Sequence, residues 1–191
     1  MIRPPCWAIG LGRTGTNSFC EALTLLGYDR ARVAHNPRFE QLRELEGGAD
    51  NGVTLFYKYL DYKFPGSKFV LLWRSLETWL KSCEYVSAKH PVNSLDADIP
   101  IMRRMLIYET VGFDRKKFIA AYHRHHEDVD RYFASRPNDL LKMNIVEEGD
   151  GWEKLCPFLG LSIPPSPFPY LHAQFPGAGR TQMYHNYSGG D

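Results

Sequence analysis

The sequence lacks long apolar runs, closely spaced cysteine pairs and any excess of one charge. Of its 191 residues, 43% are hydrophobic and 24% are charged, and the formal net charge is +1. Such a balance excludes binding of nucleic acid or of a membrane surface by bulk charge, so an anion site needs a local group of basic residues. No segment approaches the roughly 20 apolar residues of a membrane-spanning helix.

Cysteine is scarce as well, and its spacing is uninformative for metals. The four cysteines are far apart with no CxxC pair, which predicts buried, reduced thiols. They are Cys6, Cys20, Cys83 and Cys156. The first residues, "MIRPPC", do not contain the apolar core of a signal peptide. We therefore expect a cytoplasmic location.

What is present is an alternation of strand and helix patterns. Strands are predicted around 6–11, 32–35, 68–73 and 140–146, and helices around 17–26, 55–64, 100–112, 114–135 and 151–160, with another after Ser75. Residues 37–51 read as a polar loop. The length suits one domain, so we expect a single domain over 1–191, with its core at about 6–169 and an irregular tail at 170–191. The predicted fold is a three-layer αβα arrangement with a mainly parallel sheet.

A glycine-rich turn follows the first predicted strand, in "WAIGLGRTGTNSF". Glycines here let backbone N–H groups approach an anion, and the following helix contributes the positive field of its N-terminus. Hydroxyl donors and one arginine lie in the same stretch. The candidate anion-binding residues are Gly12, Arg13, Thr14, Gly15, Thr16, Asn17 and Ser18. The alternative is an N-terminal helix cap beside a surface arginine.

Two common phosphate-binding patterns fit this turn poorly. The dinucleotide pattern GxGxxG is matched, but it also requires an acidic residue at the end of the second strand, where the sequence has "VAHN". The nucleoside-triphosphate pattern requires lysine where Thr16 stands. It is commonly accompanied by a strand-end aspartate that helps to hold Mg²⁺, whereas the strand "KFVLLW" is followed by Arg74.

A second candidate anion site lies in "RSLETWLKS". Arg74 directly follows the apolar strand, and Ser82 comes eight residues later. Ser75 and Ser82 are separated by two helical turns and share a helix face. If that face looks toward the strand end, Arg74 and Ser82 can bind one phosphate, distinct from the group in the glycine-rich turn. The alternative is a capped helix with a solvated Ser82.

Together these stretches resemble the P-loop sulfotransferases, and most closely a short subfamily common in microbes and fungi. The stretches "GRTGTNS", "FPGSKFVLLWRSLETWLKS" and "GDGWEKLCPFLGLSIPPSPFP" carry the likeness, which spans about 9–169. The resemblance implies a P-loop NTPase-like fold and 3′-phosphoadenosine 5′-phosphosulfate (PAPS) as donor. It also implies that the glycine-rich turn binds the phosphosulfate, that Arg74 and Ser82 bind the 3′-phosphate, and that no metal is needed.

The resemblance leaves the catalytic groups partly open. Arg13 stands where larger relatives have lysine, and it can stabilise charge on the leaving side without donating a proton. Asp50 lies nearest to the place of the relatives' base, with His35 as its rival; Asp50 could equally cap the following helix. The relatives' C-terminal loop over the 3′-phosphate has no match, and Arg180 is a candidate substitute.

The sequence does not identify the acceptor substrate or the oligomeric state. We expect a small acceptor that bears a hydroxyl or an amine, in an apolar pocket lined by some of Tyr85, Tyr108, Phe113 and Tyr122. A homodimer is one option for the oligomeric state. The histidines of "HRHH" at 123–126 have no partner at zinc spacing and predict a solvated helix face. Alternative functions are a non-catalytic nucleotide-binding protein of the same fold and a kinase-like phosphotransferase.

Overall fold

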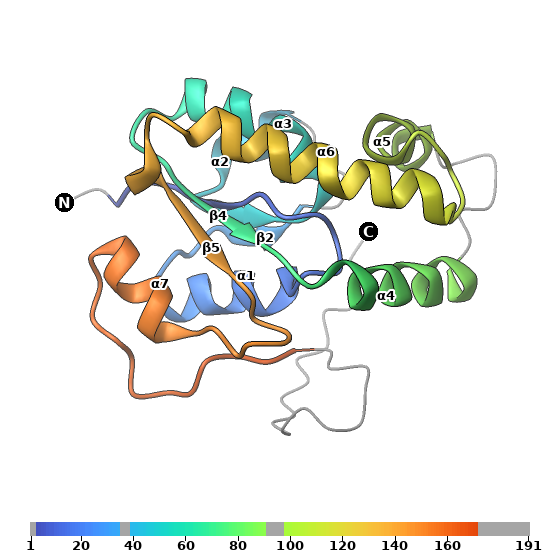
Figure 1. The fold of residues 1–191 in the computed structure, drawn as a ribbon. Coiled ribbons are helices and arrows are strands. Elements are labelled where there is room, and N and C mark those ends of the chain that lie inside the picture. The colour runs from blue at the N-terminus through green and yellow to red at the C-terminus, as the bar shows by residue number, and fades with distance from the viewer. Residues whose placement is uncertain (1–2, 35–38, 91–97, 172–191) are drawn as a thin grey trace, which may run out of the picture.

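A five-stranded parallel sheet forms the centre of the computed structural model, which describes residues 3–34, 39–90 and 98–171 (Figure 1). The strand order is β2-β3-β1-β4-β5. The strands are β1 Cys6–Ala8, β2 Ala31–Val33, β3 Gly47–Ala49, β4 Lys68–Leu72 and β5 Leu140–Met143. Because every neighbouring pair is parallel, all five carboxyl ends lie at one edge, where ligands bind in open α/β sheets.

Helices cover both faces of this sheet and one end of it. α1 (Thr16–Leu25) and α7 (Trp152–Leu159) pack on one face. α2 (Phe39–Glu44), α3 (Asn51–Lys63) and α6 (Arg115–Phe133) pack on the other. Beyond the carboxyl ends, α4 (Leu76–Lys89) and α5 (Asp98–Tyr108) pack against α6, and a 3₁₀ turn, η1 (Pro137–Asp139), precedes β5. The predicted three-layer αβα fold is confirmed.

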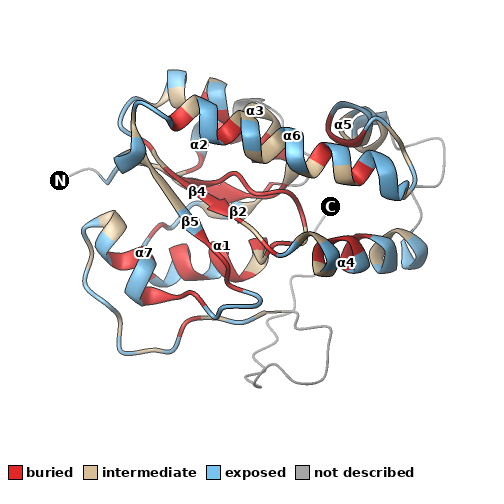
Figure 2. Ribbon diagram, in the orientation of Figure 1, coloured by how far each residue is buried: buried red, intermediate tan, exposed pale blue. Residues whose placement is uncertain are grey.

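Hydrophobic burial on both faces explains the strand sequences. In β4 the apolar residues of "KFVLL" alternate between the two layers: Val70 and Leu72 face α1, while Phe69 and Leu71 face α3 and α6. A strand buried on both sides needs a continuous apolar run rather than an alternating one. Figure 2 shows the result, with buried residues concentrated on the sheet and on the inner faces of its helices.

The prediction of a loop over 37–51 is wrong within the described residues. This segment contains α2 and the strand β3, which lies between β1 and β2 and so separates the two strands of the βαβ unit expected at the N-terminus. The sequence "GGA" has neither β-branched nor aromatic residues, so it does not look like a strand. Gly47 is required there because a Cβ atom would lie 2.5 Å from the Cys6 carbonyl oxygen.

Helix ends follow the sequence more closely. Gly27 and Gly160 have left-handed φ angles of 82° and 66° just after α1 and α7, and glycine is the residue that most often ends a helix in this way. α3 begins at Asn51, four residues before the predicted start, because Asp50 caps it. β1 and β5 are shorter than predicted, ending at Ala8 and Met143.

Three smaller expectations can also be compared with the structure. The four cysteines are buried thiols, as predicted. The histidine segment is only partly a solvated face. His123 is exposed, but His125 Nε2 donates a 2.6 Å hydrogen bond to the Ile9 carbonyl, and His126 stacks on Tyr122 at a ring distance of 4.2 Å. Among the helices of the described ranges, none has the length and apolarity to cross a membrane.

Candidate functional site

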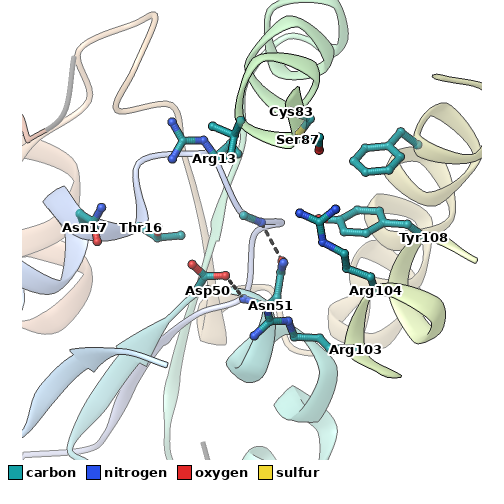
Figure 3. Close-up of a pocket in the computed structure, with 13 residues that line it drawn as sticks. Arg13, Thr16, Asn17, Asp50, Asn51, Cys83, Ser87, Arg103, Arg104 and Tyr108 are labelled. Carbon is teal, nitrogen blue, oxygen red and sulfur yellow. Dashed lines mark hydrogen bonds between the residues drawn. The ribbon is translucent and has the colours of Figure 1, made fainter. Parts of the chain in front are cut away.

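A cavity of about 200 Å³ opens at the carboxyl edge of the sheet (Figure 3). Three adjacent strands deliver residues to this edge: the glycine-rich loop (residues 10–15) follows β1, Asp50 follows β3 and Arg74 follows β4. Helices α4 and α5 close the opposite side. The lining residues are Gly12, Arg13, Thr16, Asn17, Asp50, Asn51, Cys83, Val86, Ser87, Arg103, Arg104, Tyr108 and Phe118.

The glycine-rich loop is held in place by three side chains from two helices, α3 and α4. Thr54 of α3 donates to the Gly10 carbonyl at 2.7 Å, and the indole of Trp79 of α4 donates to the Gly12 carbonyl at 2.9 Å. Asn51 Oδ1 accepts from the Gly12 amide at 2.9 Å. Trp79 is fully buried among aromatic rings, so it belongs to the core. The loop is therefore preorganised without a ligand.

Within the loop, the predicted anion-binding hydroxyls have different surroundings. Thr14 is buried, and its hydroxyl donates to the Leu11 carbonyl at 2.7 Å. Ser18 is also buried and accepts from the Leu171 amide at 2.8 Å. Thr16 and Asn17 line the cavity. The side chains facing the cavity from the start of α1 are thus Thr16 and Asn17, while Thr14 and Ser18 fix the surrounding backbone.

The N-terminus of α1 carries no side-chain cap. Its N-cap residue is Gly15, with φ of 99°, and no acidic residue lies in the first turn. The first N–H groups of a helix have no intrahelical acceptor, and together with the helix dipole they favour an anion. Gly15 is needed because its φ is strained for other residues and a Cβ atom would lie 3.3 Å from Ile145.

Arg74 and Ser82 converge on Arg13. Ser82 is buried, and its hydroxyl accepts from Arg13 Nε at 3.3 Å; Arg74 Nη1 donates to the Arg13 carbonyl at 3.4 Å. Arg74 is only 8% exposed, and its Nε atom is buried without a hydrogen-bond partner among the described residues. Arg13 therefore links the residues of the predicted second site to the glycine-rich loop.

Burial and charge act against each other at Arg74. Desolvation lowers the pKa of its guanidinium, Arg13 lowers it further, and Glu147 raises it. Glu147 accepts hydrogen bonds from the Ser75 amide and hydroxyl at the start of α4. Ser75 is thus the N-cap residue of α4, but its hydroxyl donates to Glu147 and does not cap the helix. The Glu147 carboxylate, from the loop after β5, accepts from the Ser75 amide instead. Arg74 therefore lies against the Arg13 backbone with its guanidinium partly desolvated, and pairing with an anion would stabilise such a charge.

Asp50 combines a capping role with a place in the cavity. Its Oδ1 accepts from the Asn51 amide at the start of α3, and the residue is 7% exposed. Its backbone lies at φ 84° and ψ 175°, and Arg13 has φ 77°. Among the described residues, three that are not glycine have positive φ, and these two line the cavity. Sparsely populated backbone conformations concentrate at functional sites.

Sequence reasoning missed four polar residues of the cavity, which are Asn51, Ser87, Arg103 and Arg104. Asn51 Oδ1 accepts from the Gly12 amide at 2.9 Å, and α3, which begins with Asn51, packs against α5. Arg103 and Arg104 enter from α5, and a basic pair in "MRRM" was the sequence signal that could have found them. Burial raises the pKa of Tyr108.

Some of the remaining predicted site residues lie away from the cavity, and others lie outside the described residues. Among the predicted aromatic lining residues, Tyr108 lines the cavity, whereas Tyr85 is half exposed and Phe113 packs against Phe118. His35 and Arg180 lie outside the described residues.

Fold and cavity together define an α/β protein with an arginine-lined cavity at the carboxyl edge of a parallel sheet. A family model described as a sulfotransferase domain matches residues 38–174. The chain therefore belongs to the sulfotransferase family. The match covers Asp50, Arg74, Ser82 and all of α5, while the glycine-rich loop precedes it. The search of curated proteins found no match for this chain.

Proposed function

We propose that this protein transfers a sulfuryl group from PAPS to a hydroxyl or amine of a small acceptor. Membership of the sulfotransferase family supports sulfuryl transfer. The observation that carries the choice of donor is the convergence of Arg13, Arg74 and Ser82 beside an uncapped helix N-terminus. This arrangement offers two anion-binding positions within one continuous site, as a nucleotide with phosphates on both its 3′ and 5′ positions requires.

On the donor side, the residues divide by position. The amides of the glycine-rich loop and of the first turn of α1, with Arg13, would hold the 5′-phosphosulfate. Arg74 and Ser82 would hold the 3′-phosphate. The buried Nε of Arg74 fits this role, because a buried donor without a partner costs free energy that an anion would offset.

Bound PAPS supplies the sulfuryl group: its bond from sulfur to the bridging oxygen breaks as the bond from the acceptor atom to sulfur forms. Arg13 stabilises the negative charge that develops on the departing phosphate, and it does so without transferring a proton. Asp50 accepts the acceptor's proton as general base. Its place after β3, across from Arg13, puts these two groups on opposite sides of the cavity (Figure 3).

Ligand binding tests this function directly. Thermal unfolding is followed with adenosine 3′,5′-bisphosphate, ATP with Mg²⁺ and NAD in parallel. At a hundred times its dissociation constant, the correct ligand stabilises the fold by about 2.7 kcal/mol. We expect the bisphosphate to act without Mg²⁺ and more strongly than ATP. Stabilisation by Mg-ATP or NAD alone contradicts the proposal.

Transfer itself is then measured with labelled PAPS and a panel of small phenols, alcohols and amines. Labelled sulfate on any acceptor establishes an enzyme. Tight bisphosphate binding with no transfer to any class of acceptor favours the non-catalytic nucleotide-binding alternative.

A further inference from the structure

Arg74 lies at the junction where the chain passes from β4 into α4. The strand ends at Leu72 and the helix begins at Leu76, so Arg74 belongs to neither element. Its backbone groups therefore need partners from outside a strand ladder or a helix. If Arg74 is to bind a phosphate in a defined position, contacts with other parts of the chain must set the direction of its side chain.

The peptide group that joins Arg74 to Ser75 is held at both of its polar ends. The Tyr122 hydroxyl, from α6, donates to the Arg74 carbonyl at 2.7 Å. The Ser75 amide donates to Glu147 Oε2, in the loop after β5, at 2.6 Å. A trans peptide group is planar, and its carbonyl and N–H point in opposite directions. The two side chains thus hold this peptide from opposite sides, and it cannot rotate without losing one of the bonds.

Tyr122 is itself fixed by aromatic packing. The centre of its ring lies 4.2 Å from that of His126, on which it stacks, and 5.3 Å from that of Trp79. Trp79 in turn donates to the Gly12 carbonyl in the glycine-rich loop. The hydroxyl that holds the Arg74 carbonyl therefore belongs to the aromatic cluster that also holds the glycine-rich loop.

Glu147 is fixed by a neighbour in its own loop. Asn144 is 1% exposed, and its side chain both accepts from the Glu147 amide and donates to the Glu147 carboxylate, each at 3.0 Å. The same carboxylate accepts from the Ser75 hydroxyl at 2.7 Å and from the Thr78 hydroxyl. Hydrogen bonds to an ionised acceptor are stronger than neutral ones, so this exposed side chain can still hold the peptide.

We propose that Tyr122 and Glu147 are positioning residues, which hold the peptide between Arg74 and Ser75 and so direct the Arg74 guanidinium toward the 3′-phosphate of the donor. This inference rests on the proposed function, in which Arg74 and Ser82 bind that phosphate. Both residues act through the backbone of Arg74 rather than through its guanidinium. A binding group that is directed in advance loses less conformational entropy when the ligand arrives.

The test uses two nucleotides that differ by the 3′-phosphate. Calorimetry measures the affinities for adenosine 3′,5′-bisphosphate and adenosine 5′-monophosphate, and their ratio is the contribution of that phosphate. Tyr122→Phe keeps the ring and removes only the hydroxyl. We expect it to reduce the affinity ratio at least about threefold, within the range for one neutral hydrogen bond, with the monophosphate affinity nearly unchanged. An unchanged ratio overturns the role of Tyr122.

Two substitutions of Glu147 separate geometry from charge. Glu147→Gln removes the charge but keeps an oxygen that can accept from the Ser75 amide, whereas Glu147→Ala removes both. We expect Glu147→Ala to reduce the affinity ratio about threefold or more, and Glu147→Gln to retain most of it. If Glu147→Ala leaves the ratio unchanged or raises it, the carboxylate does not position Arg74 and its part of the inference is wrong.

Tyr132→Phe is the matched control for loss of a tyrosine hydroxyl on α6. Tyr132 lies ten residues beyond Tyr122, about 15 Å along the helix, and its hydroxyl donates to Asp61 at 2.6 Å. Its substitution should lower the melting temperature and leave the affinity ratio unchanged. If it reduces the ratio as much as Tyr122→Phe does, the effect is general destabilisation and the inference is wrong.

A double-mutant cycle tests whether Tyr122 acts through Arg74. In the Arg74→Ala background, Tyr122→Phe should reduce the affinity ratio no further, because the group that it positions is already absent. A further reduction of similar size would show that Tyr122 acts on the phosphate by another route, which overturns the inference.

Failure of the proposed function gives a different result. If the wild-type protein binds the bisphosphate no more tightly than the monophosphate, the proposed donor is wrong and the inference falls with it. If the wild-type protein prefers the bisphosphate and the Tyr122 and Glu147 variants all keep that preference, the choice of donor stands and only the positioning role is wrong.

Discussion

Asp50 has two roles, and one substitution separates them. Its carboxylate caps α3 by accepting from the Asn51 amide, and it lines the cavity as the proposed base. Asparagine places an amide oxygen where the carboxylate oxygen was, is equal to aspartate as a helix cap, and tolerates positive φ. Asp50→Asn should therefore keep the cap and the melting temperature while removing the only proton acceptor that this side chain offers.

The kinetic effect should be large. Removal of a general base slows turnover by about 10²- to 10⁴-fold, which corresponds to about 2.7–5.4 kcal/mol of lost transition-state stabilisation. Asp50→Ala should lose the same activity and, in addition, the cap. That costs about 1 kcal/mol, or about 2–4 °C in melting temperature for a chain of this size. The difference between the two variants isolates the structural role.

The assay is single-turnover transfer from labelled PAPS to an acceptor identified in the panel, with bisphosphate affinity measured in parallel. Bisphosphate binding should be nearly unchanged in Asp50→Asn, because the base does not touch the donor. Near-normal turnover of Asp50→Asn, combined with loss of activity in His35→Asn, would transfer the role of base to His35. Loss of bisphosphate binding in Asp50→Asn would show that the residue is structural.

Three other measurements probe the surroundings of the site. Arg74→Ala should weaken adenosine 3′,5′-bisphosphate by about tenfold or more while barely affecting adenosine 5′-monophosphate; equal losses for both, measured by calorimetry, would make Arg74 a structural residue. The pKa of Glu147 is lowered to about 2 by its hydrogen bonds at the start of α4, so its stabilisation is present above its ordinary pKa of about 4.5 and is lost as the pH falls toward 2. Glu147→Gln should thus lower the melting temperature by a few degrees at pH 7 and have little effect near pH 2, and a pH-independent difference would contradict this. Burial and the neighbouring His125 lower the pKa of His126 to about 4. Between about pH 6.5 and 4 the unfolded chain therefore binds a proton that the folded chain does not, so the free energy of unfolding decreases as the pH is lowered through that range. His126→Gln should flatten this part of the stability curve in denaturant titrations, and an unchanged slope would assign it to other groups.

Features encoded locally could be predicted from the sequence. The glycine-rich turn, the strand "KFVLLW" and the serine eight residues after Arg74 each depend on short-range spacing. The structure places Arg74 and Ser82 around the same arginine. The helix stops at Gly27 and Gly160 were predictable for the same reason, since glycine is the usual residue at the left-handed position that ends a helix.

Features created by tertiary packing could not be predicted. β3 is a strand because β1 and β2 pair with it on either side, and its glycines are required by the close approach of Cys6 rather than by strand propensity. The place of Arg103 and Arg104 in the cavity could not be predicted either. On α5 alone they look like ordinary surface charges, and only the packing of α5 beside the start of α3 turns them toward a cavity.

The geometry gives a physical reason for arginine, rather than lysine, at position 13. Its Nε donates to Ser82, so a single side chain spans from the glycine-rich loop to α4. A guanidinium has donors on three separate nitrogen atoms in one plane, so it can contact Ser82 with one nitrogen and a ligand oxygen with another, whereas lysine concentrates its donors on one nitrogen. In the proposed reaction a proton donor is not needed at this place, because the departing phosphate is stable as an anion at neutral pH. Charge stabilisation would then be the whole demand on the leaving side, and a permanently charged side chain bonded to Ser82 would meet it without reorganisation during transfer.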